Sequence, residues 1–358
     1  MSTNIKSVIT ATGSFVPQNI ISNKDFLEHR FYEKGGEPIL RDNEEIIEKF
    51  KNITEIEERR YANNEHNASD LGYFAGKNAI ESSGIDPESL DYIIVAHNFG
   101  DIAPGSTRAD VLPAVASRIK HKLGIKNPDC VAYDLPFGCP GWLQGMIQAD
   151  YFIRSGDAKR ILVIGTETLS RVTDPHDRDS MIYADGAGAC ILEGKENSNE
   201  GILAHKTQTH TSEEAYYLYS GKSSNPDLIS EEKFIKMDGR KIYEYALKNV
   251  PLVIQQAMEK SGTTISDVKK VLVHQANGKM DEAILKRLFK LYGLKDVPAE
   301  IMPMTIAEFG NSSVATVPTL LDMILKNKMK DHQIRKGDRV VFASVGAGMN
   351  INAMVYQF

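Results

Sequence analysis

The chain has 358 residues, of which 42% are hydrophobic and 8% aromatic, so it can bury one large core or two moderate ones and does not have the composition of a disordered protein. Its formal net charge of −6 gives no support to nucleic-acid binding, although it is compatible with a local basic patch for an acidic partner. No apolar run approaches the roughly 20 residues that span a bilayer, and the amino terminus has no apolar export signal. We therefore expect a cytoplasmic protein with no membrane and no nucleic-acid partner.

Short β-rich runs alternate with longer helical patterns along the chain, which favours α/β layers with largely covered sheets. The clearest predicted strands are residues 92–96, 131–134, 161–164 and 188–192, followed by 271–273, 340–343 and 351–356. The polar, turn-rich stretch 196–201 separates the two series, so we expect two halves, residues 1–195 and 200–358. In each half an Asp-then-strand unit leads to a histidine, His97 or His274, which is a weak sign of duplication.

Two segments lack clear strand periodicity. Residues 30–60 contain a charged helical pattern at 43–50 and are interpreted as an excursion near the surface. Residues 206–230 are rich in Ser, Thr, Lys and Asn, which predicts a long surface excursion. The sequence leaves open whether this second segment is a lid or a simple loop.

The three cysteines, Cys130, Cys139 and Cys190, form no CxxC pair and are too few for a disulfide framework, so we expect free thiols. Cys139 lies between a predicted strand and an apolar helical pattern that begins at Trp142. The amide dipoles at a helix start favour a thiolate, which predicts a lowered thiol pKa. Pro140 suits the first helical position, and the amide of Cys139 stays free to hold an oxyanion. Cys130 and Cys190 carry no such turn and are interpreted as small buried apolar residues.

Two polar residues of the second half complete a candidate site. His274 closes the predicted strand 271–273, where a side chain can face a cleft, although a single histidine is more often a hydrogen-bonded bystander. Asn311 lies in a Gly-Asn turn before a helical pattern, where an N-cap is the alternative interpretation. A thiol, an imidazole and a carboxamide suit thioester condensation: the thiolate attacks one thioester, and the other two groups donate hydrogen bonds to the enolate oxygen formed when a carboxylated thioester loses CO₂.

The sequence contains no pattern for a metal or a dinucleotide cofactor. The remaining histidines show no metal-ligand spacing. Neither a GxGxxG fingerprint nor a GxxxxGK[ST] loop is present, and the small-residue stretch 344–349 is only a candidate for close approach to a ligand. We therefore expect no metal and no cofactor.

Taken together, these motifs resemble the β-ketoacyl-acyl-carrier-protein synthase III family of the thiolase superfamily, from about residue 5 to Phe358. Further matches occur in the same order at residues 58–60, 123–126, 170–178 and 183–189. The resemblance implies an α/β, thiolase-like, five-layered αβαβα fold built from two duplicated halves, and a homodimer. It also implies that Cys139, His274 and Asn311 form the catalytic triad.

The same resemblance implies a ping-pong acyltransferase that initiates fatty acid synthesis. Acyl-CoA would acylate Cys139, CoA would leave, and malonyl-acyl carrier protein would enter for decarboxylative condensation. The backbone N–H groups of Cys139 and Gly346 would form the oxyanion hole. Arg171 would pack against the CoA adenine, and acyl carrier protein would dock on basic residues of the helix after His274. These residues are Lys279, Lys286 and Arg287.

Several departures from the family pattern concern the substrate. Trp142 stands close to the nucleophile, the adenine-stacking tryptophan is absent, and Leu112 occupies a dimer position that often carries a pocket-limiting Phe. The candidate substrate-binding residues are therefore Arg171, Leu112, Trp142 and Asn277.

Three hypotheses follow from these motifs: an initiating synthase with a short primer, a specialised relative using longer or aromatic acyl donors, and a non-catalytic partner subunit. The retained triad argues against the third, and we favour the first.

Overall fold

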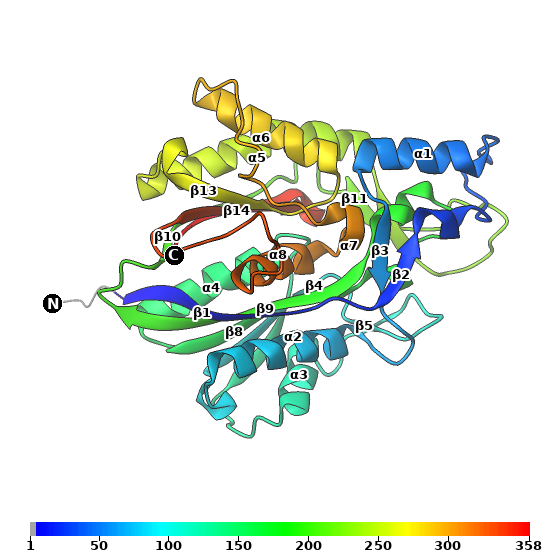
Figure 1. The fold of residues 1–358 in the computed structure, drawn as a ribbon. Helices are drawn as coiled ribbons and strands as arrows, with labels where there is room; N and C mark the ends of the chain where they lie inside the picture. The colour runs from blue at the N-terminus through cyan, green and yellow to red at the C-terminus, as the bar shows by residue number, and fades with distance from the viewer. Residues whose placement is uncertain (1–4) are drawn as a thin grey trace.

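The computed structural model describes residues 5–358, which form five layers (Figure 1). Two sheets lie face to face with helices between them, and each sheet carries further helices on its outer side. The expected αβαβα order is therefore present. Residues 1–4, on which the expectation of no export signal partly rests, lie outside the described residues.

The first sheet is formed by residues of the amino-terminal half. Its strands, in spatial order, are β1 (Ile5–Phe15), β9 (Asp185–Glu196), β8 (Arg160–Thr168), β4 (Tyr92–His97) and β7 (Val131–Pro136). β9 is antiparallel to both β1 and β8, whereas β8, β4 and β7 are mutually parallel. Helices α2 (Ala68–Ser83) and α3 (Val115–Leu123) cover the outer face. Because β4 is covered on both faces, its sequence is a nearly continuous run of apolar residues rather than an alternation of apolar and polar residues.

The second sheet belongs to the carboxyl-terminal half. Its strands, in spatial order, are β10 (Gly201–Thr209), β15 (Asn350–Gln357), β14 (Arg339–Gly346) and β13 (Val268–Val273). Helices α5 (Gly239–Ser261) and α6 (Gly278–Leu291) lie on its outer side. Every strand of the first sheet ends by Glu196 and every strand of the second begins at or after Gly201, so we propose the boundary between the halves in this interval.

Helices α4 (Gly141–Ser155) and α8 (Thr316–Leu325) fill the middle layer. α8 is apolar on nearly all sides, as expected for a helix enclosed between sheets. Its buried Asp322 accepts hydrogen bonds from the hydroxyls of Thr12 at 2.8 Å and Ser14 at 2.6 Å. These contacts tie the middle layer to β1, because a buried carboxylate is stable only when its oxygens are hydrogen-bonded.

The remaining elements are short or lie outside the layers. They are α1 (Asn43–Thr54), α7 (Ile306–Phe309) and three two-stranded ribbons: β2 (Asn19–Ser22) with β3 (Glu58–Tyr61), β5 (Asp101–Ile102) with β6 (Ala109–Asp110), and β11 (Leu218–Gly221) with β12 (Phe234–Met237). Within residues 5–358, no helix is both long enough and apolar enough to cross a membrane.

The strands predicted from the sequence are all present, and the helical pattern at 43–50 is α1. The prediction of a long surface excursion over residues 206–230 is partly wrong. Residues 206–209 complete β10 by pairing with β15, and 218–221 form β11. A polar composition masked these strands because each has a face or an edge exposed to solvent.

Candidate active site

Cys139 lies in the turn between β7 and α4, as predicted. Gly138 adopts a φ of +67°, and a Cβ at this position would lie 2.8 Å from the backbone N and O of Ala347. Only glycine suits both the left-handed backbone and the close approach. Pro140 is the residue before the first helical position rather than that position itself. The turn therefore brings the nucleophile against the loop that follows β14.

The expected lowering of the Cys139 pKa is wrong. Burial raises the pKa of this thiol to about 12, and the nearby Glu167 carboxylate raises it further, whereas a hydrogen bond from Ser313 acts in the opposite direction. Desolvation penalises the thiolate more than the helix start stabilises it. The thiol therefore needs a proton acceptor before it can attack.

His274 follows the last residue of β13, and its backbone N–H donates to Ala343 O at 2.8 Å. The side chain is buried, and burial lowers the pKa of the imidazole to about 4. Its Nδ1 has no hydrogen-bond partner among residues 5–358. His274 is therefore a neutral imidazole at pH 7, and one of its ring nitrogens carries a proton.

Asn311 is held by its backbone and by one end of its side chain. Its N–H donates to Ile182 O at 2.9 Å, and its own carbonyl accepts from Ala184 N at 2.8 Å. Its side-chain Oδ1 accepts from Ser313 N at 2.8 Å. This bond occupies the oxygen end of the amide and leaves the Nδ2 end as the donor.

The three predicted catalytic residues line one cavity, although Cys139 belongs to the first half of the chain and the other two to the second. Most of the cavity wall is apolar. It includes Ile182, Tyr183, Leu218, Met237, Ile242, Met280, Val345 and Met349. A second cavity also reaches Cys139 and is lined by Asn98, Phe99, Leu169, Tyr219, Ile235 and Ser313. The nucleophile thus lies where two cavities meet.

Gly346, the other predicted oxyanion residue, lies directly against the nucleophile. A Cβ on Gly346 would be 2.5 Å from Cys139 N and 2.8 Å from Cys139 Cβ. Its backbone is extended, so the requirement for glycine is one of space rather than of conformation. The structure therefore brings the two predicted oxyanion-hole residues together.

The predicted substrate-binding residues have different locations. Asn277 lines the main cavity and caps α6, its Oδ1 accepting from Met280 N at 3.0 Å. Trp142 is 1% exposed and packs against Phe342 in the core between the sheets, so the prediction that it contacts substrate is wrong. The sequence did not reveal this because it does not show which face of α4 is buried. Trp142 lies in the first turn of α4, on the face that packs between the sheets.

Arg171 is engaged within the protein. Its guanidinium donates to Asn67 Oδ1 and to the carbonyls of Ile102, Asn63 and His66. Both terminal nitrogens of Arg171 are therefore engaged in hydrogen bonds within the chain. These bonds hold together the loops that contribute their acceptors. Stacking on CoA remains a prediction.

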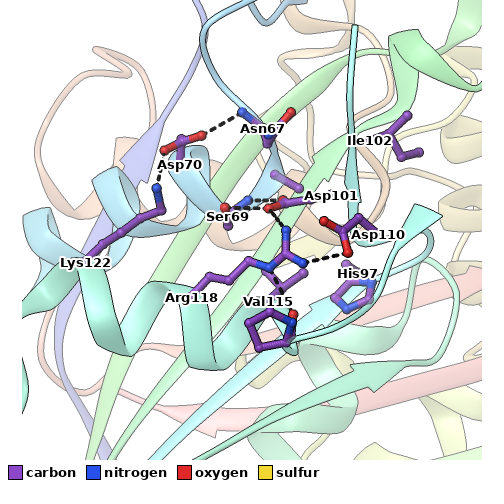
Figure 2. A network of polar contacts seen from close by, with 12 residues as sticks. Asn67, Ser69, Asp70, His97, Asp101, Ile102, Asp110, Val115, Arg118 and Lys122 are labelled. Carbon is purple, nitrogen blue, oxygen red and sulfur yellow. Dashed lines mark hydrogen bonds and ion pairs between the residues drawn. The ribbon is translucent and has the colours of Figure 1, made fainter. Parts of the chain in front are cut away.

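Leu112 is 82% exposed on the loop between β6 and α3, outside both cavities of this chain. The base of this loop is anchored by Arg118, which pairs with Asp101 at 2.9 Å and with Asp110 at 2.9 Å (Figure 2). Asp101 also accepts hydrogen bonds from Ser69 at 2.7 Å. Leu112 is therefore presented outward from a fixed base.

The three predicted docking residues are exposed on α6. Lys286 pairs with Glu282 at 2.6 Å, and Arg287 donates to Leu247 O at 3.3 Å. Lys279 is exposed in the first turn of the helix, near the cavity residue Asn277. Docking of a carrier protein here remains a prediction.

Sequence reasoning missed a polar group beside the nucleophile. Asn98 at the end of β4, Glu167 in β8 and Ser313 adjoin one another. Ser313 could have been noticed because it is two residues from Asn311 in the chain. Glu167 carried no signal, since it lies beyond the predicted strand 161–164 and a single carboxylate is usually assigned to a solvent-facing position.

Known proteins of one family match this chain over nearly its whole length. The profile of 3-oxoacyl-[acyl-carrier-protein] synthase III matches residues 133–211, and its carboxyl-terminal counterpart matches 258–358. The chain is 30% identical over 359 residues to β-ketoacyl-[acyl-carrier-protein] synthase III of Brucella anthropi, covering 99% of this chain and 100% of that one. It is 29% identical over 357 residues to the protein of the same name from Erythrobacter litoralis, with 99% and 100% covered. The crystal structure of β-ketoacyl-[acyl-carrier-protein] synthase III from Thermus thermophilus superposes with a TM-score of 0.81 at 28% identity, covering 98% of this chain and 99% of that one.

Proposed function

Because this chain belongs to the 3-oxoacyl-[acyl-carrier-protein] synthase III family of condensing acyltransferases, we propose that it joins an acyl-CoA primer to malonyl-acyl carrier protein and so initiates fatty acid synthesis. The observation that carries the proposal is that Cys139, His274 and Asn311 line one cavity. A nucleophile and two hydrogen-bond donors around one space suit two successive reactions of thioesters.

In the first reaction the Cys139 thiolate attacks the carbonyl carbon of the acyl thioester. The N–H groups of Cys139 and Gly346 donate to the oxyanion, in keeping with the close approach of these two residues. The carbon–sulfur bond to CoA then breaks, CoA leaves, and the acyl group remains on Cys139. Cys139 is therefore the nucleophile of acylation, and His274 and Asn311 are reserved for the second reaction.

In the second reaction a malonyl thioester occupies the space next to His274 and Asn311. The Nδ2 of Asn311 and the protonated nitrogen of the neutral imidazole donate to the thioester oxygen as the bond to CO₂ breaks. These bonds are strongest when the oxygen carries the enolate charge, so they favour the transition state over the bound substrate. The enolate carbon then attacks the acyl group on Cys139 and releases the thiol.

We also propose a homodimer in which Leu112 reaches the partner subunit. Leu112 is a large apolar side chain, exposed on a loop whose base is fixed by ion pairs, which is an arrangement suited to an interface. Acyl carrier protein is proposed to dock on the exposed basic residues of α6, where its acidic surface finds charge complementarity.

A second candidate function is condensation or transfer of a longer or aromatic acyl group. The observation that favours it is the contribution of the β11–β12 segment to the cavities. Leu218 of β11 lines both of them, and Met237 of β12 extends the apolar wall of the first. This wall provides hydrophobic surface for more than a short primer.

The deciding experiment is intact-protein mass spectrometry after incubation with acyl-CoAs from acetyl to dodecanoyl and with an aromatic acyl-CoA. Cys139→Ala is the control, since it removes the acceptor of the acyl group. A mass gain from acetyl or short branched donors that is absent in the control supports the initiating synthase. Selective gain from long or aromatic donors supports the second candidate, and no gain from any donor overturns both.

A further inference from the structure

Cys139 shares a cavity with Asn98 and Ser313, which belong to a polar group that the proposed condensation does not use. The Asn98 Nδ2 donates to Glu167 Oε1 and to Ser313 Oγ, the latter at 2.8 Å. Ser313 lines the second cavity together with Cys139, and its side chain acts to lower the pKa of both the Cys139 thiol and the Glu167 carboxyl group. The hydroxyl of Ser313 therefore lies between the nucleophile and a carboxyl group.

The backbone is shaped to place Ser313 there. Its φ is +52°, in the left-handed region that non-glycine residues seldom adopt, and its N–H is held by Asn311 Oδ1. The next residue, Val314, packs its carbonyl onto β8 at Gly165, where a Cβ would lie only 2.3 Å from that oxygen. Because side chains two residues apart in a strand share a face, Glu167 is on the same side of β8 as this contact.

Glu167 is enclosed in the protein. Its side chain is 2% exposed, and burial, together with the charge of Asp185 on β9, raises the pKa of its carboxyl group well above the usual value. The titratable groups facing it are Asp185 and the thiol of Cys139. His97, on the adjacent strand β4, is directed to Asp134 at 3.0 Å. A buried carboxylate with a raised pKa is a stronger base than an exposed one.

We propose that Glu167 accepts the thiol proton of Cys139 through the hydroxyl of Ser313, an inference that rests on the proposed acylation of Cys139. The hydrogen-bonding capacity of Ser313 matches this role. Its oxygen accepts a hydrogen bond from Asn98 Nδ2 at 2.8 Å. A hydroxyl oxygen can accept a second proton donor and donate its own proton, so in the proposed relay it receives the thiol proton while its own proton passes to Glu167.

The proton of Cys139 reaches Glu167 in two linked transfers. The S–H bond of Cys139 breaks and its proton passes to Ser313 Oγ, while the original Ser313 proton passes to the ionised carboxylate of Glu167. The thiolate then forms the new bond to the acyl carbon, and the bond from that carbon to the CoA sulfur breaks. The proton stored on Glu167 neutralises the departing CoA thiolate, so CoA leaves as a free thiol and Glu167 is ionised again.

His274 is a weaker candidate for this step. Its burial disfavours the imidazolium that would result from taking the proton. The relay also leaves His274 free as a neutral donor for decarboxylation. The two half-reactions then use different groups around one sulfur atom.

The test measures the rate of Cys139 alkylation by iodoacetamide across about pH 5 to 10, with peptide mapping to separate it from the buried Cys130 and Cys190. Glu167→Gln keeps the size of the side chain but cannot accept a proton. If Glu167 is the acceptor, this variant reacts only at higher pH, and its rate at neutral pH falls about tenfold or more. If Glu167 instead acts only through its negative charge, Glu167→Gln reacts at lower pH than wild type, because removing a nearby negative charge eases thiolate formation. An unchanged or lowered midpoint therefore overturns the proposal.

Ser313→Gly tests whether the proton passes through the Ser313 hydroxyl, since glycine removes that hydroxyl and tolerates the left-handed backbone. We expect it to show the same upward shift as Glu167→Gln. The matched control is Ser312→Ala, whose hydroxyl contacts Thr316 Oγ1 at 3.3 Å instead, and it should retain the wild-type profile. A wild-type profile in Ser313→Gly overturns the relay even if Glu167→Gln shifts the midpoint.

Alkylation requires no acyl donor, so this result is independent of the proposed function. If wild-type protein is not acylated by any acyl-CoA but shows the predicted shifts, the proposed function fails and the proton relay stands. If wild-type protein is acylated and the shifts are absent, the relay alone fails.

Discussion

The Oδ1 atom of Asn311 accepts a hydrogen bond from the backbone N–H of Ser313 at 2.8 Å. This single contact gives the carboxamide a direction, because an amide whose oxygen is engaged has its nitrogen left to donate. Ser313 in turn lines the second cavity together with Cys139. Two residues in one turn thus connect the decarboxylation donor with the nucleophile.

Asn311→Ala should separate the two half-reactions. The variant keeps Cys139 and the oxyanion residues, so acylation by acyl-CoA should continue, whereas decarboxylation of malonyl thioester should fall about 100-fold through loss of a hydrogen-bond donor. His274→Ala should behave in the same way, and Cys139→Ala should lose acylation. The measurements are protein mass gain and CO₂ release. Equal loss of acylation in all three variants would contradict this division of roles.

Gly346→Ala should impair acylation. The added Cβ would lie 2.5 Å from Cys139 N, so the turn must shift and both oxyanion donors move from their positions. A displacement of this size costs about 100-fold in a positioned reaction. Gly186→Ala is a suitable control, because its Cβ would meet its nearest atom at 3.6 Å, an ordinary contact. The measurement is the single-turnover acylation rate of each variant. Equal rates for Gly346→Ala and Gly186→Ala would contradict the prediction that a Cβ at Gly346 displaces the oxyanion donors.

Lys236→Met should destabilise the segment that carries Met237. Lys236 is buried, and its Nζ donates to Asp174 at 2.6 Å, to Asp177 at 2.9 Å and to Ser224 at 2.8 Å. Removing one partner of a buried ion pair costs about 3 kcal/mol. Urea unfolding measures this loss, and the exposed Lys233→Met serves as the control. Similar unfolding midpoints for the two variants would contradict the prediction.

The pH dependence of this loss follows from Asp174. Burial acts to raise the pKa of Asp174, but hydrogen bonds from Lys236, Ser224 and His176, together with the Lys236 charge, outweigh it and hold the pKa below its usual value. A carboxyl with a depressed pKa in the folded state stabilises the protein above its unfolded pKa of about 3.9, and the contribution is lost as pH falls through the folded value. The difference between Lys236→Met and wild type should therefore narrow below about pH 4. A difference that stays constant into acid would count against this pair.

Arg118→Met should loosen the loop that presents Leu112. The two carboxylates that Arg118 contacts lie in the ribbon that precedes this loop, at Asp101 in β5 and Asp110 in β6 (Figure 2). Hydrogen exchange over residues 98–114 should become faster, whereas Lys122→Met, which removes only the contact with Asp70, should leave these residues near the wild-type rate. Equal exchange in both variants would show that Arg118 does not anchor the loop.

The sequence predicted the parts of this protein that depend on local pattern. The parallel strands of the first sheet were visible as apolar runs, and the turn at Cys139 was visible because a strand and a helical pattern meet there with glycine and proline. The edge strand β10 was missed because its carboxyl-terminal residues are polar and partly exposed. Trp142 was misassigned because proximity to Cys139 in the chain does not give the direction of a side chain on a helix.

By itself, the sequence determined the α/β layers, through the alternation of strand and helix patterns, and the three candidate residues and the family, through the resemblance of its motifs to the synthase III family. The tertiary structure decided which way the groups face and what surrounds them. Burial sets the pKa of Cys139 and of His274, the turn at Asn311 orients its amide, and the packing of Val314 on Gly165 brings Ser313 next to Glu167. These properties arise from contacts between residues far apart in the chain, and neither solvation nor direction can be read from local pattern.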